Sequence, residues 1–266
     1  MKTTFLSILW FSLALAPVHS LPRALRAAFW LWIHLLHFTV ANQVYAMHED
    51  AINKAHRPLP AKRITIHNAI KLRWVSIPLC LGISLLYSVE TLYASASFIA
   101  LTFIYNELHV DSGFWLFRNI VNGLGFAAFE WGTTLLAGTD CQHLDPAAQL
   151  AIFNSAAIIV TTIQVQDFRD VVGDARVGRA TLPLISERWA RISVITTILP
   201  WSLALSRVWE LNSFAAALFV VLGIFVGLRF LLYRSVRSDA TSYYVYNIWL
   251  SYAHFLAACW RYKSLT

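Results

Sequence analysis

FAAALFVVLGIFVGLRFLLY, residues Phe214 to Tyr233, is an apolar run long enough to cross a bilayer as a helix. The whole chain of 266 residues shares this character, since 58% of it is hydrophobic, only 13% is charged and the mean hydropathy is +0.57. Such a composition lies far from the balance of a soluble domain. Because a backbone in lipid must satisfy its own hydrogen bonds, the sequence predicts an all-α, multi-pass transmembrane bundle embedded in a lipid bilayer.

Further apolar segments bring the predicted number of membrane spans to about nine. They cover residues 2–20, 24–47, 66–87, 91–105, 114–137, 146–164, 181–205 and 243–260. The first segment also fits a secretory signal peptide, because a lysine and an apolar core precede the small, polar ending from Pro17 to Ser20. No Gly/Ser-rich or Pro-rich linker divides the chain, so we expect a single domain over residues 1–266.

Basic residues are distributed unevenly between the two sides that nine spans define. The poorer side holds only Arg23, Arg26, Arg207, Arg261 and Lys263 of the 21 Lys and Arg residues. The positive-inside rule places the richer side in the cytoplasm. Two polar clusters, residues 42–60 and residues 166–183, both emerge on that side. We expect a protein of the endoplasmic reticulum membrane. Since topology explains the net charge of +7, the sequence does not indicate binding of nucleic acid.

The second polar cluster, QDFRDVVGDARVGRATLP, runs from Gln166 to Pro183 and places three aspartates in a chain that otherwise avoids charge. In a helix Asp167, Asp170 and Asp174 are spaced i, i+3 and i+7, so their carboxylates project from one face. Grouped carboxylates repel one another unless a cation lies between them, and Mg2+ is commonly held by carboxylates together with substrate phosphates. The alternative is a solvated loop of mixed charge.

The first polar cluster, NQVYAMHEDAINKAHRPLP, covers residues 42–60. Continued as a helix, it would carry Asn42, Glu49 and Asn53 on one face with Asp50 beside them, which again offers oxygen ligands. An ordinary charged helix end facing water is the alternative.

Basic residues accompany both clusters, with Lys54 and Arg57 in the first and Arg169 and Arg179 in the second. Guanidinium groups suit phosphate oxygens, so the two clusters together predict Mg2+ ions and a clamped diphosphate. A diphosphate at the mouth of an apolar, aromatic-rich bundle suggests an isoprenyl diphosphate. Departure of its diphosphate would leave an allylic carbocation, which aromatic faces can stabilise.

Both clusters resemble the aspartate-rich motifs of the UbiA superfamily of intramembrane prenyltransferases. The matching residues are Asn42, Glu49-Asp50, Asn53-Lys54, Arg57-Pro58-Leu59-Pro60, Asp167-x-x-Asp170-x-x-Gly173-Asp174 and Gly178-Arg179-x-Thr181-Leu182-Pro183. The second motif matches closely, whereas Gln43 stands where the commoner NDxxDxxxD form of the first has its aspartate. This altered form is similar to a fungal branch that includes terpene cyclases.

The resemblance implies nine transmembrane helices, Mg2+ dependence and a prenyl diphosphate substrate. It implies metal or diphosphate roles for Asn42, Glu49, Asp50, Asn53, Asp167, Asp170 and Asp174, and phosphate contacts for Lys54 and Arg57. A further match joins Tyr105 to Arg118 and Asn122. Many aromatic prenyltransferases carry a lysine shortly after that tyrosine, but Asn106, Glu107, Leu108 and His109 follow here, so Arg118 is the candidate replacement.

Two polar residues inside predicted spans add to the candidate site. Glu130 lies eight residues after Asn122, and an intramembrane carboxylate indicates function by default. It would steer a carbocation or take the last proton; the alternative is a protonated glutamate hydrogen-bonded to a neighbouring helix. Gln164 precedes the second cluster by about one helical turn and is expected to face the same cavity.

These observations favour a terpene cyclase that ionises farnesyl or geranylgeranyl diphosphate. We expect catalytic roles for Asp170, Tyr105 and Glu130, and substrate contacts that include Arg118, Arg169, Arg179, Asn122 and Gln164. The alternatives are a UbiA-type enzyme that transfers the prenyl group to an aromatic acceptor and, more remotely, an ion-coupled transporter.

Overall fold

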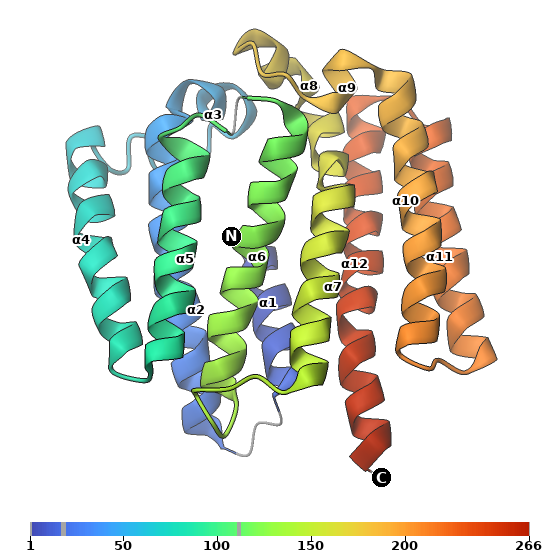
Figure 1. The fold of residues 1–266 in the computed structure, drawn as a ribbon. Coiled ribbons are helices and arrows are strands. Elements are labelled where there is room, and N and C mark those ends of the chain that lie inside the picture. The colour runs from blue at the N-terminus through green and yellow to red at the C-terminus, as the bar shows by residue number, and fades with distance from the viewer. Residues whose placement is uncertain (1, 17–19, 111–112, 266) are drawn as a thin grey trace. The chain divides into compact units, whose positions relative to one another are not determined.

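The computed structural model of the chain describes residues 2–16, 20–110 and 113–265, without the side chains of residues 2–4, 49, 53, 264 and 265. Every regular element within these ranges is a helix, as Figure 1 shows. The predicted all-α class is therefore confirmed.

Long helices coincide with the predicted apolar segments. They are α1 (Lys2–Leu15), α2 (Leu21–Tyr45), α4 (Ile66–Leu85), α5 (Val89–Asn106), α6 (Trp115–Ala137), α7 (Pro146–Thr162), α10 (Glu187–Val208), α11 (Ser213–Leu232) and α12 (Val236–Leu265). Short elements occupy the polar clusters, namely α3 (Met47–Asn53), the 3-10 helix η1 (Ile163–Gln166), α8 (Asp167–Arg176) and α9 (Leu182–Ile185). The prediction of about nine bundle helices agrees with this arrangement.

Three helical stretches of the described chain are long and apolar enough to cross a membrane by length and composition alone. They are Leu21–Tyr45, Pro146–Arg176 and Ser213–Leu232. Other long helices interrupt their apolar runs with polar side chains, as Arg73 does in α4 and Glu130 does in α6. The bundle therefore carries functional candidates inside helices that a hydropathy threshold alone would not select.

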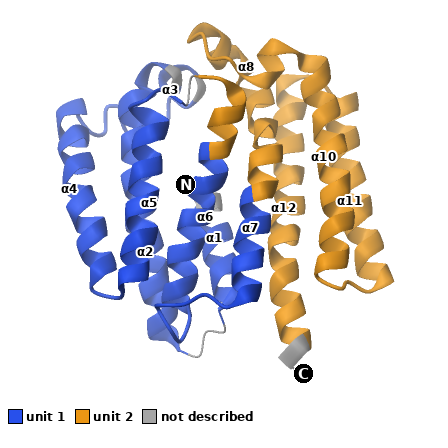
Figure 2. Ribbon diagram, viewed as in Figure 1, with its two compact units in different colours: residues 1–111, 121–156 blue, residues 112–120, 157–266 orange. Residues whose placement is uncertain are grey.

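The chain divides into two compact units, which Figure 2 colours separately. Unit 1 comprises residues 1–111 and 121–156, and unit 2 comprises residues 112–120 and 157–266. The first residues of α6 thus belong to unit 2 and the rest of α6 to unit 1, while α7 passes from unit 1 into unit 2. The single domain expected from the sequence stays a prediction.

In unit 1, α2 packs against α1, α4 and α5 around a buried tryptophan. The Trp30 indole N–H donates to Ser84 Oγ at 2.7 Å, and the His34 ring stacks on Trp30 with centroids 3.8 Å apart. Helix α1 buries Ile8 and Leu15 in this unit, and the alternative of a cleaved signal peptide stays a prediction. Residues 17–19, most of the ending expected for such a peptide, lie outside the described residues.

Side-chain caps begin several of the helices where the sequence changes from polar to apolar. Thr65 accepts a hydrogen bond from the Asn68 amide at the start of α4, and Ser88 accepts one from the Thr91 amide at the start of α5. Asn212 does the same for α11. Each cap satisfies one of the amide groups that a helix leaves without an internal partner.

In unit 2, α10 packs against α11, and α8 packs against α9 and α12. The prediction of one helix over residues 181–205 is wrong, because the backbone is extended at Ser186 and separates α9 from α10. A proline in the first turn of α9 and a serine at the N-cap of α10 explain this, since both residue types favour helix starts.

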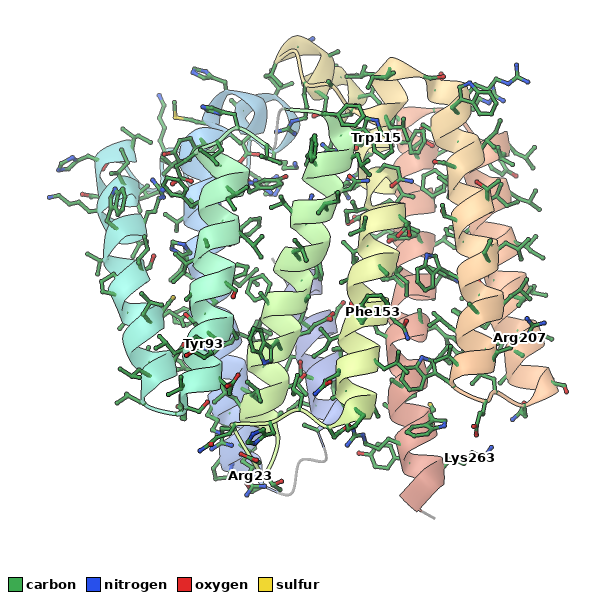
Figure 3. The ribbon with its side chains drawn as sticks, viewed as in Figure 1. Arg23, Tyr93, Trp115, Phe153, Arg207 and Lys263 are labelled. Carbon is green, nitrogen blue, oxygen red and sulfur yellow. The ribbon has the colours of Figure 1, made fainter. Side chains whose placement is uncertain are left out.

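Each unit carries its polar cluster at one end of its helices. In unit 1, Arg23 begins α2 and lies at the end away from α3, and in unit 2, Arg207 and Lys263 lie at the end away from α8 (Figure 3). A charged cluster within each unit is thus separated by the length of the helices from the basic residues at the opposite end.

Gly132 of α6 allows the close approach of the Trp30 ring, since an added Cβ would lie 2.2 Å from Trp30 Cη2. Trp30 is fully buried and its N–H donates to Ser84, so displacement of its ring would cost packing contacts and a hydrogen bond. We expect Gly132→Ala to lower the free energy of unfolding by about 1–3 kcal/mol, measured by thermal unfolding in detergent. Gly125→Ala, on the same helix, meets nothing within 4 Å and should be neutral or stabilising; equal losses in both variants would contradict the prediction.

Candidate functional site

The second polar cluster forms the predicted helix, α8, and places its acidic residues partly out of water. Asp167 and Asp174 are 3% and 1% exposed, while Asp170 is half-buried. Arg118, from the first turn of α6, forms a short ion pair with Asp167, and both side chains are buried within unit 2. Arg179 donates to Asp174 Oδ1 at 3.2 Å. A guanidinium therefore meets each of the two buried carboxylates of α8.

Two other residues predicted for this cluster make contacts of a different kind. The Arg169 guanidinium lies 4.0 Å from the centroid of the Tyr243 ring, and its Nε is 3.9 Å from Asp170 Oδ1. The Gln164 amide accepts from Asn119 and donates to Ser193 Oγ and a backbone carbonyl. These bonds join α6, η1 and α10, so the burial of Gln164 has a structural explanation without a ligand.

In the first polar cluster, α2 ends at Tyr45 and α3 continues after a break at Ala46. Arg57 brings its polar groups together, because one of its nitrogens lies 2.7 and 2.9 Å from the two oxygens of Asp50 and 3.4 Å from Asn42 Oδ1. Asp50 is 1% exposed. Lys54 caps α3 through its backbone, whereas the side chains of Glu49 and Asn53 lie outside the described residues.

Gln43, which stands where the commoner motif has an aspartate, has a structural role in unit 1. Its side chain is 4% exposed, accepts from the Leu59 amide at 3.4 Å and donates to the Thr39 carbonyl at 3.3 Å. The segment after α3 is thereby tied back to α2. Gln43 therefore helps to order the segment that contains Arg57.

The segment after Tyr105 also departs from the usual motif. Glu107 forms an ion pair with Arg73 of α4, and both side chains are largely buried. Arg73 also donates to the Tyr45 hydroxyl at 3.3 Å, which links this pair to the end of α2. An acidic residue neutralised by Arg73 therefore occupies the region in which many aromatic prenyltransferases carry a lysine. The Tyr105 ring itself is half-buried and packs 6.1 Å from the Phe38 ring.

Glu130 is fully buried in unit 1 and is held by a neighbouring helix. Ser155 of α7 donates to Glu130 Oε1 at 2.7 Å, whereas Oε2 has no hydrogen-bond partner among the described residues. The Asn122 amide nitrogen, on the same helix, is also buried without a partner in the described chain. The serine contact joins α6 to α7, as the alternative of a glutamate hydrogen-bonded to a neighbouring helix expects, and a catalytic role for Glu130 stays a prediction.

The structure thus brings the candidates together in two groups. Unit 1 joins Asn42, Asp50 and Arg57, and unit 2 joins Arg118 with Asp167 and Arg179 with Asp174. Within the described part of the chain, no three His, Cys, Asp or Glu side chains converge as a metal site would require. Arginines instead lie beside the carboxylates of Asp50, Asp167 and Asp174.

Sequence reasoning overlooked several residues that support these groups. The main ones are Gln43, Arg73, Arg191 and Asp239, all of which are buried. A charged residue inside an apolar segment was the available signal for Arg73 and Arg191. Their partners are remote in sequence, so spacing alone does not identify the pairs.

Comparison with known proteins gives the class of protein. The UbiA prenyltransferase family profile matches residues 4–253, so the chain belongs to this family. Fumagillin beta-trans-bergamotene synthase of Aspergillus fumigatus is 31% identical over 242 residues, covering 90% of this chain and 82% of that protein. Diterpene cyclase eriG of Hericium erinaceus is 30% identical, with 82% of this chain and 70% of that protein covered. Polyprenyl transferase eriF of the same organism is 27% identical, with 82% of this chain and 74% of that protein covered.

Solved structures agree on the fold. A UbiA homolog from Aeropyrum pernix K1 superposes with a TM-score of 0.70 at 15% identity, covering 100% of this chain and 98% of that one. A UbiA homolog from Archaeoglobus fulgidus bound to GPP and Mg2+ gives 0.65 at 13% identity, with 96% of each chain covered. The fold is therefore the UbiA helical bundle of an integral membrane protein.

The Arg118–Asp167 pair predicts a strong coupling in stability. Arg118→Met leaves a buried carboxylate without its closest cation and should cost about 3–5 kcal/mol of unfolding free energy. The double variant Arg118→Met/Asp167→Asn removes both charges and should recover most of this loss. Thermal unfolding of the two singles and the double gives the coupling energy, and additive losses would contradict the pairing.

Proposed function

We propose that this protein is a membrane-embedded terpene cyclase of the UbiA family that consumes an isoprenyl diphosphate. The main support is a set of buried carboxylates, each paired with an arginine. These carboxylates lie on the segments that match the two UbiA motifs. Similarity to fungal terpene synthases supports cyclisation over transfer. Burial of Glu107 against Arg73, where many aromatic prenyltransferases carry a lysine, supports it further.

The donor chemistry of the two groups fits Mg2+. Carboxylate and amide oxygens make up the set, and hard divalent cations prefer such ligands. Asn42, Glu49, Asp50 and Asn53 would hold metal from the first cluster, and Asp167, Asp170 and Asp174 would hold it from the second. The chemistry that Mg2+ supplies when bound is positive charge that stabilises a departing diphosphate. A solved UbiA homolog bound to GPP and Mg2+ supports this assignment.

The arginines of the chain have a direct role in the proposed reaction. Arg57, Arg118 and Arg179 would exchange their carboxylate partners for phosphate oxygens, since guanidinium pairs well with either anion. Lys54, Arg169 and the Asn122 and Gln164 amides would add further polar contacts to the substrate, with Tyr105 beside the reacting end. Departure of diphosphate with the electron pair of the breaking C–O bond leaves an allylic carbocation in the apolar bundle.

Glu130 is assigned to the later part of the reaction. Its Oε2, which has no hydrogen-bond partner among the described residues, would accept the proton that the final carbocation loses as the product double bond forms. Alternatively, the charge of Glu130 would steer the cation. Ser155 would hold the carboxyl group in place through the other oxygen.

Membrane placement follows the basic residues. We place both polar clusters on the cytoplasmic face of the endoplasmic reticulum membrane, with residues 1–266 as one UbiA-type domain. Arg23, Arg207 and Lys263, at the far ends of their units, would face the lumen.

The direct test incubates membranes containing the protein with geranyl, farnesyl or geranylgeranyl diphosphate, with and without Mg2+, followed by mass spectrometry of the extract. We expect a Mg2+-dependent cyclic hydrocarbon without any added acceptor. Asp170→Ala should reduce diphosphate release by about 100-fold or more, because a ligand for the Mg2+ that would stabilise the departing diphosphate is lost. Asp140→Ala, at an exposed aspartate outside both clusters, is the matched control and should keep wild-type turnover.

Several outcomes of this assay would change the proposal. Retained turnover in the Asp170 variant contradicts its role. Consumption of diphosphate only when an aromatic acceptor is present indicates the transferase instead, for which the similarity to polyprenyl transferase eriF is the supporting observation. Glu130→Gln should keep diphosphate release and alter the products, and unchanged products would remove Glu130 from the reaction.

A further inference from the structure

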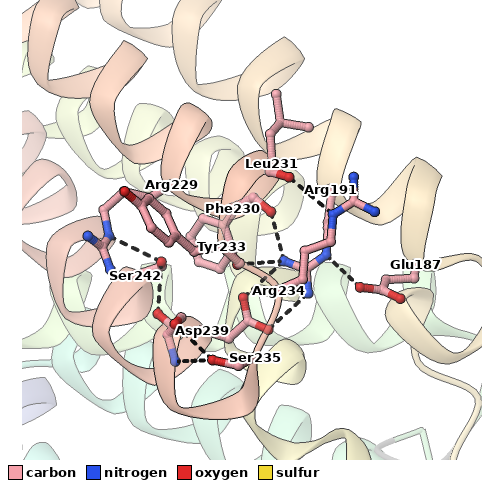
Figure 4. Close-up of polar contacts among 11 residues, drawn as sticks. Glu187, Arg191, Arg229, Phe230, Leu231, Tyr233, Arg234, Ser235, Asp239 and Ser242 are labelled. Carbon is pink, nitrogen blue, oxygen red and sulfur yellow. Dashed lines mark hydrogen bonds and ion pairs between the residues drawn. The ribbon is translucent and has the colours of Figure 1, made fainter.

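A buried arginine joins three helices of unit 2 beside the second acidic cluster. Arg191 of α10 is 4% exposed and makes a two-pronged ion pair with Asp239 of α12, with both N–O distances at 2.9 Å (Figure 4). The same guanidinium donates to the Phe230 carbonyl at 2.7 Å, at the end of α11. Its Nε donates to Glu187, whose side chain is 55% exposed. The polar edge of Arg191 is therefore fully occupied.

The same guanidinium also lies over an aromatic ring of the acidic helix. Arg191 Cζ is 4.6 Å from the centroid of the Phe168 ring, and Phe168 also packs 5.3 Å from the Phe230 ring. Phe168 is 1% exposed and directly follows Asp167 in α8. The contact thus connects the buried ion pair to the residue next to a candidate metal ligand.

Helix α8 needs such support from outside. It has ten residues, and isolated helices of this length are marginal in water. Phe168 is the one large side chain of α8 that is fully buried. The position of its ring therefore fixes the rotation of α8 about the helix axis. Rotation of α8 would redirect every carboxylate that the helix carries.

A contribution to stability alone is a weak reason to bury this ion pair. Removing two charges from water costs several kcal/mol, and apolar replacements of similar volume are often neutral or stabilising. Arginine offers something that an apolar residue or a lysine does not, since its planar group can bind a carboxylate along its edge and stack on an aromatic ring with its face. In unit 2 one guanidinium binds the Asp239 carboxylate and lies over the Phe168 ring.

We propose that Arg191, oriented by Asp239, is a positioning residue that seats Phe168 and so sets the direction in which α8 presents Asp167 and Asp170 to a metal-bound diphosphate. This inference rests on the proposed function, because it concerns the affinity of that site. Arg191 itself does not touch the substrate. Its effect passes through Phe168.

The test measures binding, with inorganic diphosphate and Mg2+ as the probe. Purified full-length protein in detergent is titrated with diphosphate at fixed Mg2+, and the rise in melting temperature gives an apparent Kd. Arg191→Lys, Asp239→Asn and Phe168→Leu should each raise this Kd by about 10-fold or more, as loss of supporting contacts around a metal site typically does. Glu187→Gln removes the exposed partner of the same arginine and should leave the Kd unchanged.

Comparison of the variants separates positioning from folding. The proposal would be overturned if Arg191→Lys, Asp239→Asn and Phe168→Leu lower the melting temperature without ligand but keep the wild-type Kd for diphosphate. If Arg191→Lys does not fold, Asp239→Asn and Phe168→Leu still decide the outcome. The double variant Arg191→Lys/Phe168→Leu should bind no more weakly than the worse single, whereas additive losses would overturn the route through Phe168. Wild-type protein that gains no stability from diphosphate and Mg2+ would instead overturn the proposed function, and this inference with it.

Discussion

Carboxylates held away from water need a cation, and this requirement shapes both polar clusters of the molecule. An uncompensated charge inside an apolar bundle is costly, and several of the buried aspartates are paired with an arginine. Asp50 has Arg57, Asp167 has Arg118, and Asp239 has Arg191. Because a guanidinium pairs equally well with phosphate, the contacts that stabilise the protein alone also provide the groups that a diphosphate requires.

Pairing of the same arginines with carboxylates or with phosphate explains why the acidic residues are tolerated in so apolar a chain. With the arginines on the carboxylates, each cluster is close to neutral and the surrounding helices pack normally. In the proposed reaction the arginines move to phosphate oxygens and the carboxylates are left to Mg2+, so no charge stays unpaired at either stage. The buried pair of Arg191 and Asp239 differs, because its polar atoms are all engaged and its ring contact with Phe168 supports α8.

Sequence alone predicts much of the fold, because membrane helices follow from long apolar runs and α8 follows from the spacing of its aspartates. The break at Ser186 escaped prediction, although the polar residues Ser186, Glu187 and Arg188 interrupt the apolar run there. At the site, motif matching selected Asp167 and Arg118 separately, but their contact joins residues 49 positions apart. Sequence periodicity does not identify contacts between residues that are remote in sequence. For the same reason, the ion pair of Arg73 with Glu107 and the structural role of Gln43 were not predicted.

We propose that the acidic residues after α2 and the acidic residues after α7 each hold divalent metal that binds a prenyl diphosphate. A crystal structure with Mn2+ in place of Mg2+ and a non-hydrolysable prenyl thiodiphosphate tests it most directly, because anomalous scattering locates the metal without assumptions. We expect Mn2+ peaks bonded to Asp50 or its neighbours and to Asp167 or Asp170, with diphosphate density beside the metal and arginines on its oxygens. Metal and diphosphate bound to only one cluster, or elsewhere, would contradict it.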